Sequence, residues 1–185
     1  MMEYLSGSRG FPVEHAALGF LLERPMHGYA LRMRIEEGLG PLWRIASSQL
    51  YQVIHRLEKD GLVHRTSRTT SAGPSRAVLH VTEPGAAAFW AWAGEPVATM
   101  RDVRVEFAAK LYFTRRLRPH AVTQLIDRQI SILDQMQNHI QAQGHGDDAA
   151  LQAAWQSLQQ STIDNFSRWL RTHRDVLQRP KEAVS

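Results

Sequence analysis

The sequence predicts a mainly α-helical protein in two parts, with short helices and one β-hairpin in the first half and long helices in the second. Apolar residues recur at helical spacing along most of the chain. Residues that favour strands are concentrated in two short runs, Leu62 to Thr66 and Ala77 to Thr82. Ten glutamines lie between Ala121 and Gln160, in a composition that favours helices over strands. A chain of 185 residues, 43% hydrophobic and 22% charged, fits one substantial domain or two small ones.

Composition also excludes several classes of protein. The longest apolar runs, such as Ala16 to Leu22 and Ala86 to Ala93, are much shorter than the roughly 18 residues that span a bilayer. The stretch from Met1 to Pro12 lacks the features of a secretory signal. The absence of cysteine excludes disulfides, a cysteine nucleophile and a thiolate zinc site. We therefore expect a cytoplasmic protein with no membrane segment, no cofactor and no metal.

Two short helices are predicted first. Apolar residues share one helical face from Val13 to Glu23, and Pro25 prevents a long continuation. The second helix is predicted over His27 to Glu37, with Gly38 and Gly40 expected to end it.

The third helix has the clearest boundaries. Ser47 or Ser48 is the predicted N-cap, and the inward stripe comprises Leu50, Val53, Ile54 and Leu57. At its end, Asp60 is expected at the C-cap, Gly61 in the left-handed conformation and Leu62 against the helix, as in a Schellman motif.

A hairpin and a fourth helix follow. Two strand-like runs flank Ser67 to Ser75, which is rich in Thr, Ser, Gly and Pro. Thr82 is predicted to cap a helix whose apolar run extends from Ala86 to Trp92. The order of helices and hairpin is that of a winged helix-turn-helix, in which the hairpin is the wing.

The motif Gly94-Glu95-Pro96 predicts a domain boundary. We expect a flexible segment over residues 1–12, the winged helix-turn-helix domain over 13–93, a helical domain over 94–178 and a flexible tail over 179–185. The second domain should contain helices over Val105 to Leu117, His120 to Gln143 and Asp148 to Leu177. Because an antiparallel pair of such long helices cannot bury its apolar stripes alone, we expect a homodimer.

The third helix presents side chains that suit DNA. Its outward face carries hydroxyl, amide, imidazole and guanidinium groups, which bond base edges and phosphates. These candidate DNA-binding residues are Ser47, Ser48, Gln49, Tyr51, Gln52, His55 and Arg56. From Arg44 to Arg76 six basic residues oppose two acidic ones, so this segment alone matches the net charge of +4. Arg65, Arg68 and Arg76 of the wing should hold the flanking backbone or minor groove.

The sequence offers two alternatives to DNA binding, an enzyme and a protein-interaction module. Motifs for a nucleophile elbow, a phosphate loop, a dinucleotide site or a zinc protease are absent, so an enzyme is disfavoured. His139 and His145 lack the spacing of a metal pair on one helical face. A helical protein-interaction module is the remaining alternative, although it leaves the basic hairpin unexplained.

Four runs carry a resemblance to a known family. They are Ala17 to Leu22, Pro25 to Leu31, Ser48 to Tyr51 with Arg56 to Val63, and Val81 to Gly85. In order and spacing they resemble the PadR family of transcriptional regulators across about Val13 to Trp92. The segment Arg101 to Phe113 is similar to the start of the C-terminal helical domain in longer members. Val81 and Pro84 are mild departures from the family pattern.

The resemblance implies a DNA-binding regulator, and the symmetry of a homodimer predicts a near-palindromic operator. Family members are typically dimeric repressors, some of which are released from DNA by small aromatic or drug-like effectors, and a few are activators. The motif residues carry over to Tyr29, Gln49, Tyr51 and Arg56. We expect an effector-modulated dimeric repressor, with an activator that has no effector as the alternative. Three aromatic residues of the last helix are candidates for an effector site or the dimer interface: Trp155, Phe166 and Trp169.

Overall fold

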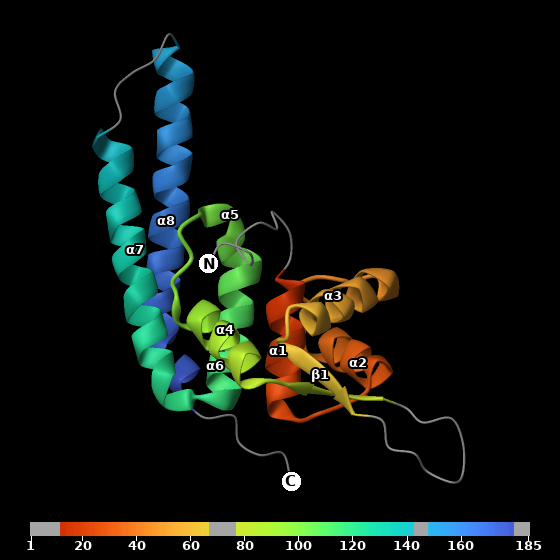
Figure 1. The fold of residues 1–185 in the computed structure, drawn as a ribbon. Helices are drawn as coiled ribbons and strands as arrows, with labels where there is room; N and C mark the ends of the chain where they lie inside the picture. The colour runs from red at the N-terminus through yellow and green to blue at the C-terminus, as the bar shows by residue number, and fades with distance from the viewer. Residues whose placement is uncertain (1–11, 67–76, 143–147, 180–185) are drawn as a thin grey trace, which may run out of the picture. The chain divides into compact units, whose positions relative to one another are not determined.

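The computed structural model describes residues 12–66, 77–142 and 148–179 (Figure 1). It divides the chain into two compact units, Met1–Gly94 and Glu95–Ser185. The mainly helical class with one hairpin is confirmed. Arg68, Arg76, the first eleven residues and residues 180–185 lie outside the described residues, as does the tip of the wing.

Helix α1 (Val13–Glu23) is the centre of the first unit and has the predicted bounds. It contacts α2 (Gly28–Leu39), α3 (Ser47–Lys59), α4 (Glu83–Gly94) and strand β2 (Val78–Val81), as Figure 1 shows for the helices. Eight of its eleven residues are buried. Leu31, Ile35, Leu50, Ile54 and Phe89 are among the fully buried side chains that complete this core.

Two predicted helix boundaries need correction. Helix α2 continues through Gly38 to Leu39 and ends at Gly40, the second of the two predicted glycines, which is its C-cap. Leu39 is fully buried, so its packing outweighs the low helix propensity of Gly38. At the start of α3 the N-cap is Ala46 rather than a serine, and its carbonyl accepts the Leu50 N–H at 3.1 Å. Ser47 and Ser48 therefore lie in the first turn of the helix, exposed to solvent.

The predicted Schellman motif closes α3. Gly61 has a φ of 70°, in the left-handed region. Its N–H donates to the Glu58 carbonyl at 3.1 Å, and the Leu62 N–H donates to the Leu57 carbonyl at 2.9 Å. The chain thereby turns directly from α3 into the hairpin.

The hairpin pairs β1 (Val63–Thr66) with β2 in antiparallel register, with His64 opposite His80. Met26 adds a bridge to Leu79 on the other side of β2. The predicted cap of α4 is confirmed, because the Gly85 N–H donates to Thr82 Oγ1 at 3.1 Å.

In the second unit, the regular structure of the described residues is helical. Helix α5 (Met100–Asp102) leads through a π-helical turn, η1 (Val103–Phe107), into α6 (Ala108–Leu117). A 3₁₀ turn, η2 (Pro119–Ala121), precedes α7 (Val122–Ala142), which packs alongside α8 (Ala149–Gln178) in Figure 1. The first predicted helix thus begins five residues early, with a π turn in it. Asp148 caps α8 by accepting the Leu151 N–H at 2.9 Å.

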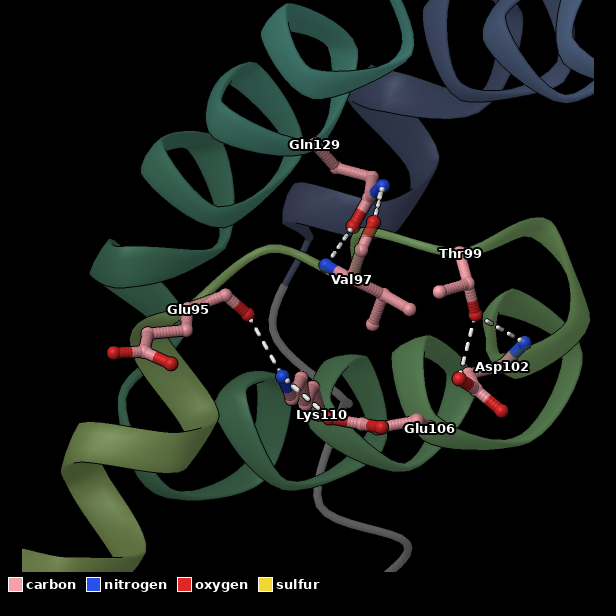
Figure 2. A network of polar contacts seen from close by, with 7 residues as sticks. All are labelled: Glu95, Val97, Thr99, Asp102, Glu106, Lys110 and Gln129. Carbon is pink, nitrogen blue, oxygen red and sulfur yellow. Dashed lines mark hydrogen bonds and ion pairs between the residues drawn. The ribbon is translucent and has the colours of Figure 1, made fainter. Parts of the chain in front are cut away.

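Two buried polar side chains form hydrogen bonds to the backbone of the first residues of the second unit (Figure 2). Gln129 is fully buried; its Oε1 accepts the Val97 N–H at 2.7 Å and its Nε2 donates to the Val97 carbonyl at 2.9 Å. Lys110, only 2% exposed, donates to the Glu95 carbonyl at 2.9 Å and pairs with Glu106 at 2.8 Å. Residues 95–97 therefore belong structurally to the helices of this unit.

Within the described part of the chain, no helix has both the length and the apolar composition required to span a bilayer.

Candidate nucleic-acid interface

The outward face of α3 is polar and open to solvent. Lys59 is exposed, and so are all seven candidate residues that the sequence analysis placed on this helix: Ser47, Ser48, Gln49, Tyr51, Gln52, His55 and Arg56. The buried stripe on the opposite side is the predicted one. With 3.6 residues per turn, Ser48, Gln52 and Lys59 point directly away from the core. Arg56 lies along one edge of the face and Glu58 along the other.

Tyr51 is fixed against the start of α2. A Cβ atom added to Gly28 would lie 3.1 Å from Cε1 of Tyr51, so the ring lies directly over the glycine. Tyr51 is nevertheless 50% exposed on the α3 face. Packing against a backbone restricts the ring without burying it.

Arg56 is held by a carboxylate from another helix. Its Nη2 donates to Oε1 of Glu14, in the first turn of α1, at 2.5 Å. The guanidinium side chain is 55% exposed, whereas the side chain of Glu14 is 15% exposed. Sequence reasoning missed Glu14, because its partner lies 42 residues away and no local pattern links the two.

Arg65 of the wing is also held by a carboxylate. Its Nη2 donates to Oε2 of Glu58 at 2.7 Å, and its Nε donates to Oε1 of the same side chain. This two-donor contact joins the last turn of α3 to β1. Both arginines that the sequence proposed for DNA contact and that the structure describes are therefore ion-paired within the chain.

A pair of histidines lies on the same hairpin. The rings of His64 and His80 are nearly parallel, with centroids 5.1 Å apart and 16° between planes. His80 Nε2 also contacts Thr66 Oγ1 at 2.9 Å. Since imidazole and hydroxyl groups bond phosphate oxygens, this pair extends the polar surface of the wing. The residues that the structure describes contain no group of three or more histidine, aspartate or glutamate side chains that could hold a metal ion.

The aromatic residues of α8 divide into two environments. Phe166 packs edge-on against Phe107, with centroids 5.5 Å apart, and stacks with Trp169 at 6.1 Å. Trp155 lies about three helical turns earlier and is 58% exposed. The three predicted residues thus form no single cluster. Trp155 belongs to a row of exposed apolar side chains on α8, which Trp169 also joins through its exposed part: Leu151, Trp155, Leu158, Trp169 and Val176.

A hollow of about 320 Å³ lies beside the turn between α2 and α3. Its apolar lining comes from Ile35 and Trp43. Its charged lining consists of two cationic side chains, Arg32 and Arg44, and the carboxylate of Glu36. The hollow was not predicted from the sequence, because its lining residues come from both sides of a turn.

A family model and a curated relative match parts of this chain. Residues 17–91 match the model of the transcriptional regulator PadR-like family. The negative transcriptional regulator PadR of Bacillus subtilis is 27% identical over 120 residues, which cover 64% of this chain and 65% of the relative. The match therefore spans slightly less than two thirds of that relative.

Solved structures of regulators are similar to this chain at low identity. Bacillus subtilis PadR in complex with operator DNA has a TM-score of 0.45 at 18% identity, covering 89% of this chain and 98% of the other. The same regulator in complex with p-coumaric acid has a TM-score of 0.41 at 20% identity, covering 90% and 99%. A transcriptional regulator from Clostridium thermocellum reaches 0.39 at 24% identity, covering 43% and 74%.

Proposed function

This chain carries a domain of the PadR-like family of transcriptional regulators, residues 17–91, and on that premise we propose that it binds double-stranded DNA sequence-specifically. The observation that carries the proposal is the outward face of α3, where no exposed residue between Ser47 and Arg56 is acidic. A helix of this kind fits the major groove, where its amides and guanidinium groups read base edges.

Each group on α3 has a chemical role in this proposal. Gln49 and Gln52 are suited to adenine, and Arg56 to guanine or phosphate. Ser47, Ser48 and Tyr51 supply hydroxyls for phosphate oxygens, and His55 supplies an imidazole. Arg65, together with Arg68 and Arg76 beyond the described part of the wing, would hold the flanking backbone or minor groove.

We further propose that the chain acts as a homodimer through α8. The row from Leu151 to Val176 leaves five large apolar side chains exposed, of which Leu151 is 66% exposed. Such a row is typically covered by another helix, and a second copy supplies an identical one. A symmetric dimer requires a near-palindromic operator whose half-sites lie about 34 Å apart, or a multiple of that distance.

The test is a fluorescence-anisotropy titration against the DNA upstream of the chain's own gene and against a scrambled duplex, at two salt concentrations. If about eight phosphates are neutralised per dimer, the logarithm of affinity should fall with the logarithm of salt at a slope near −7. Selective, salt-sensitive binding supports the proposal. Equal, weak binding to both duplexes, and to duplexes enriched from a random pool, refutes it.

Repression modulated by a small aromatic effector is the form of regulation we propose. The name of the Bacillus subtilis relative, a negative regulator, supports the direction of regulation. The Phe166–Trp169 stack on α8 supplies an aromatic surface, and the hollow beside Trp43 is a second location. Isothermal titration calorimetry with p-coumaric acid as the first probe tests whether an aromatic acid binds. Repeating it on Trp169→Ala and Trp43→Phe tests which of the two locations it occupies. An activator without an effector would show no heat and no change in operator affinity.

A helical interaction module is the alternative function, favoured by the same exposed row on α8. It predicts a monomer in sedimentation velocity and no salt-dependent affinity for any duplex.

A further inference from the structure

Two glutamates border the outward face of α3, and each holds an arginine that the proposed function assigns to DNA. Glu14 reaches Arg56 from α1, along one edge of the face. Glu58 reaches from the other edge to Arg65 on β1. The two ion pairs have different geometries, and the difference bears on what each arginine can still bind.

Arg56 is held by one amino group only. The contact of its Nη2 with Glu14 leaves Nε and Nη1 outside that pair. A guanidinium carries five N–H donors, so a group bound in this way still presents donors to a base or a phosphate. Glu14 is largely buried and lies at the N-terminus of α1, where the helix dipole favours a carboxylate. It is therefore a fixed anchor for a long side chain that is otherwise exposed.

Arg65 is held by two donors. Nε and Nη2 both bond to the carboxylate of Glu58, and this is the paired geometry with which arginine also grips phosphate. DNA must therefore displace Glu58 before it can use the same edge of the guanidinium. The displacement costs the free energy of the exposed ion pair.

We propose that the two glutamates act in opposite senses on DNA binding: Glu14 positions Arg56 for contact, whereas Glu58 competes with DNA for Arg65. The inference rests on the proposed function. Ordering a long side chain on binding lowers affinity by about two- to tenfold. Glu14 avoids this loss because it already holds Arg56 in place before DNA binds. Breaking an exposed ion pair lowers affinity by up to about fivefold, a loss that Glu58 imposes.

The test compares three variants that each remove one negative charge: Glu14→Gln, Glu58→Gln and the control Glu37→Gln. Glu37 is an exposed partner of Arg34 on α2 and does not contact either arginine pair. Wild-type protein first enriches its preferred duplex from a random-sequence pool. Dissociation constants are then measured by anisotropy for that duplex and for its scrambled form, after circular dichroism has shown equal thermal unfolding.

Relative to the control, Glu58→Gln should tighten binding of the preferred duplex by up to about fivefold per subunit. Glu14→Gln should weaken it by about two- to tenfold per subunit without weakening the scrambled duplex, so that the ratio of the two affinities falls. Each effect should vanish in the background that lacks the arginine, Arg65→Ala for Glu58 and Arg56→Ala for Glu14.

Changes equal to those of the control on both duplexes, or effects that persist without the arginines, would overturn the inference while leaving the proposed function intact. If either glutamine variant unfolds early, the reciprocal variants Arg56→Lys and Arg65→Lys replace it, since lysine keeps the charge but lacks the forked donors. Arg56→Lys should then lower the affinity ratio, and an unchanged ratio again overturns the inference. If the wild type enriches no duplex, the proposed function itself fails.

Discussion

Replacing Gln129 with leucine should destabilise the second unit by about 2–4 kcal/mol. The variant removes both hydrogen bonds to Val97, a residue that is 4% exposed, and leaves its N–H and carbonyl buried without those partners. Each such group costs about 1–3 kcal/mol, and the added apolar burial of leucine offsets part of the sum. Gln137→Leu is the matched control, because this half-buried glutamine of α7 donates to the exposed Asp164, at 2.8 Å, and its loss leaves no buried backbone group without that partner.

Urea unfolding followed by circular dichroism measures the free energy of unfolding. Hydrogen exchange of peptides covering residues 95–99 shows whether the loss of stability includes this segment. We expect Gln129→Leu to unfold at lower urea and the Val97 amide to exchange faster, with the control within about 0.5 kcal/mol of wild type. Equal midpoints for the two variants, or unchanged exchange at Val97, would refute the reasoning that these two bonds secure the segment.

Three further predictions concern the stability of the first unit, the proposed DNA contact of α3 and the proposed dimer contact of α8. Gly85→Ala should destabilise the first unit by about 1–3 kcal/mol in thermal unfolding, because its Cβ would lie 2.1 Å from the Leu62 carbonyl oxygen; an unchanged melting temperature would contradict this. Arg56→Ala should weaken operator binding by about 1–3 kcal/mol with lost preference at one position per half-site, whereas a uniform loss across sequences would identify a phosphate contact. Trp155→Glu should shift sedimentation from dimer to monomer, and Ser157→Glu, on the other side of α8, should not; equal behaviour of the two would remove α8 from the dimer contact.

The sequence predicts best where local chemistry decides the structure. The bounds of α1 follow from apolar periodicity between two prolines, and the turn after α3 follows from Gly61, since a left-handed residue suits glycine. The inward stripe of α3 was also correct. Its polar face could therefore be identified without coordinates, because burial on one side of a helix fixes what lies on the other.

Long-range polar contacts could not be predicted in this way. Glu14 and Arg56 are separated by 42 residues, and Gln129 and Val97 by 32. Each pair forms only when helices pack, and single polar residues carry no periodic signal of their partners. Ala46 at the N-cap of α3 has a similar explanation, because backbone geometry began the helix one residue before the serines that the cap preference indicated.

Helices α1 and α3 contact each other but differ in how freely their residues can be replaced during evolution. Almost every position of α1 faces a neighbouring element, so most substitutions there alter folding before they alter recognition. The outward positions of α3 are exposed, and apart from Tyr51, which packs against Gly28, and Arg56, which pairs with Glu14, their side chains can change at little cost in stability. A protein built in this way can change the DNA sequence that it recognises through substitutions at a few exposed positions of α3. The buried helix α1 meanwhile maintains the fold that positions α3.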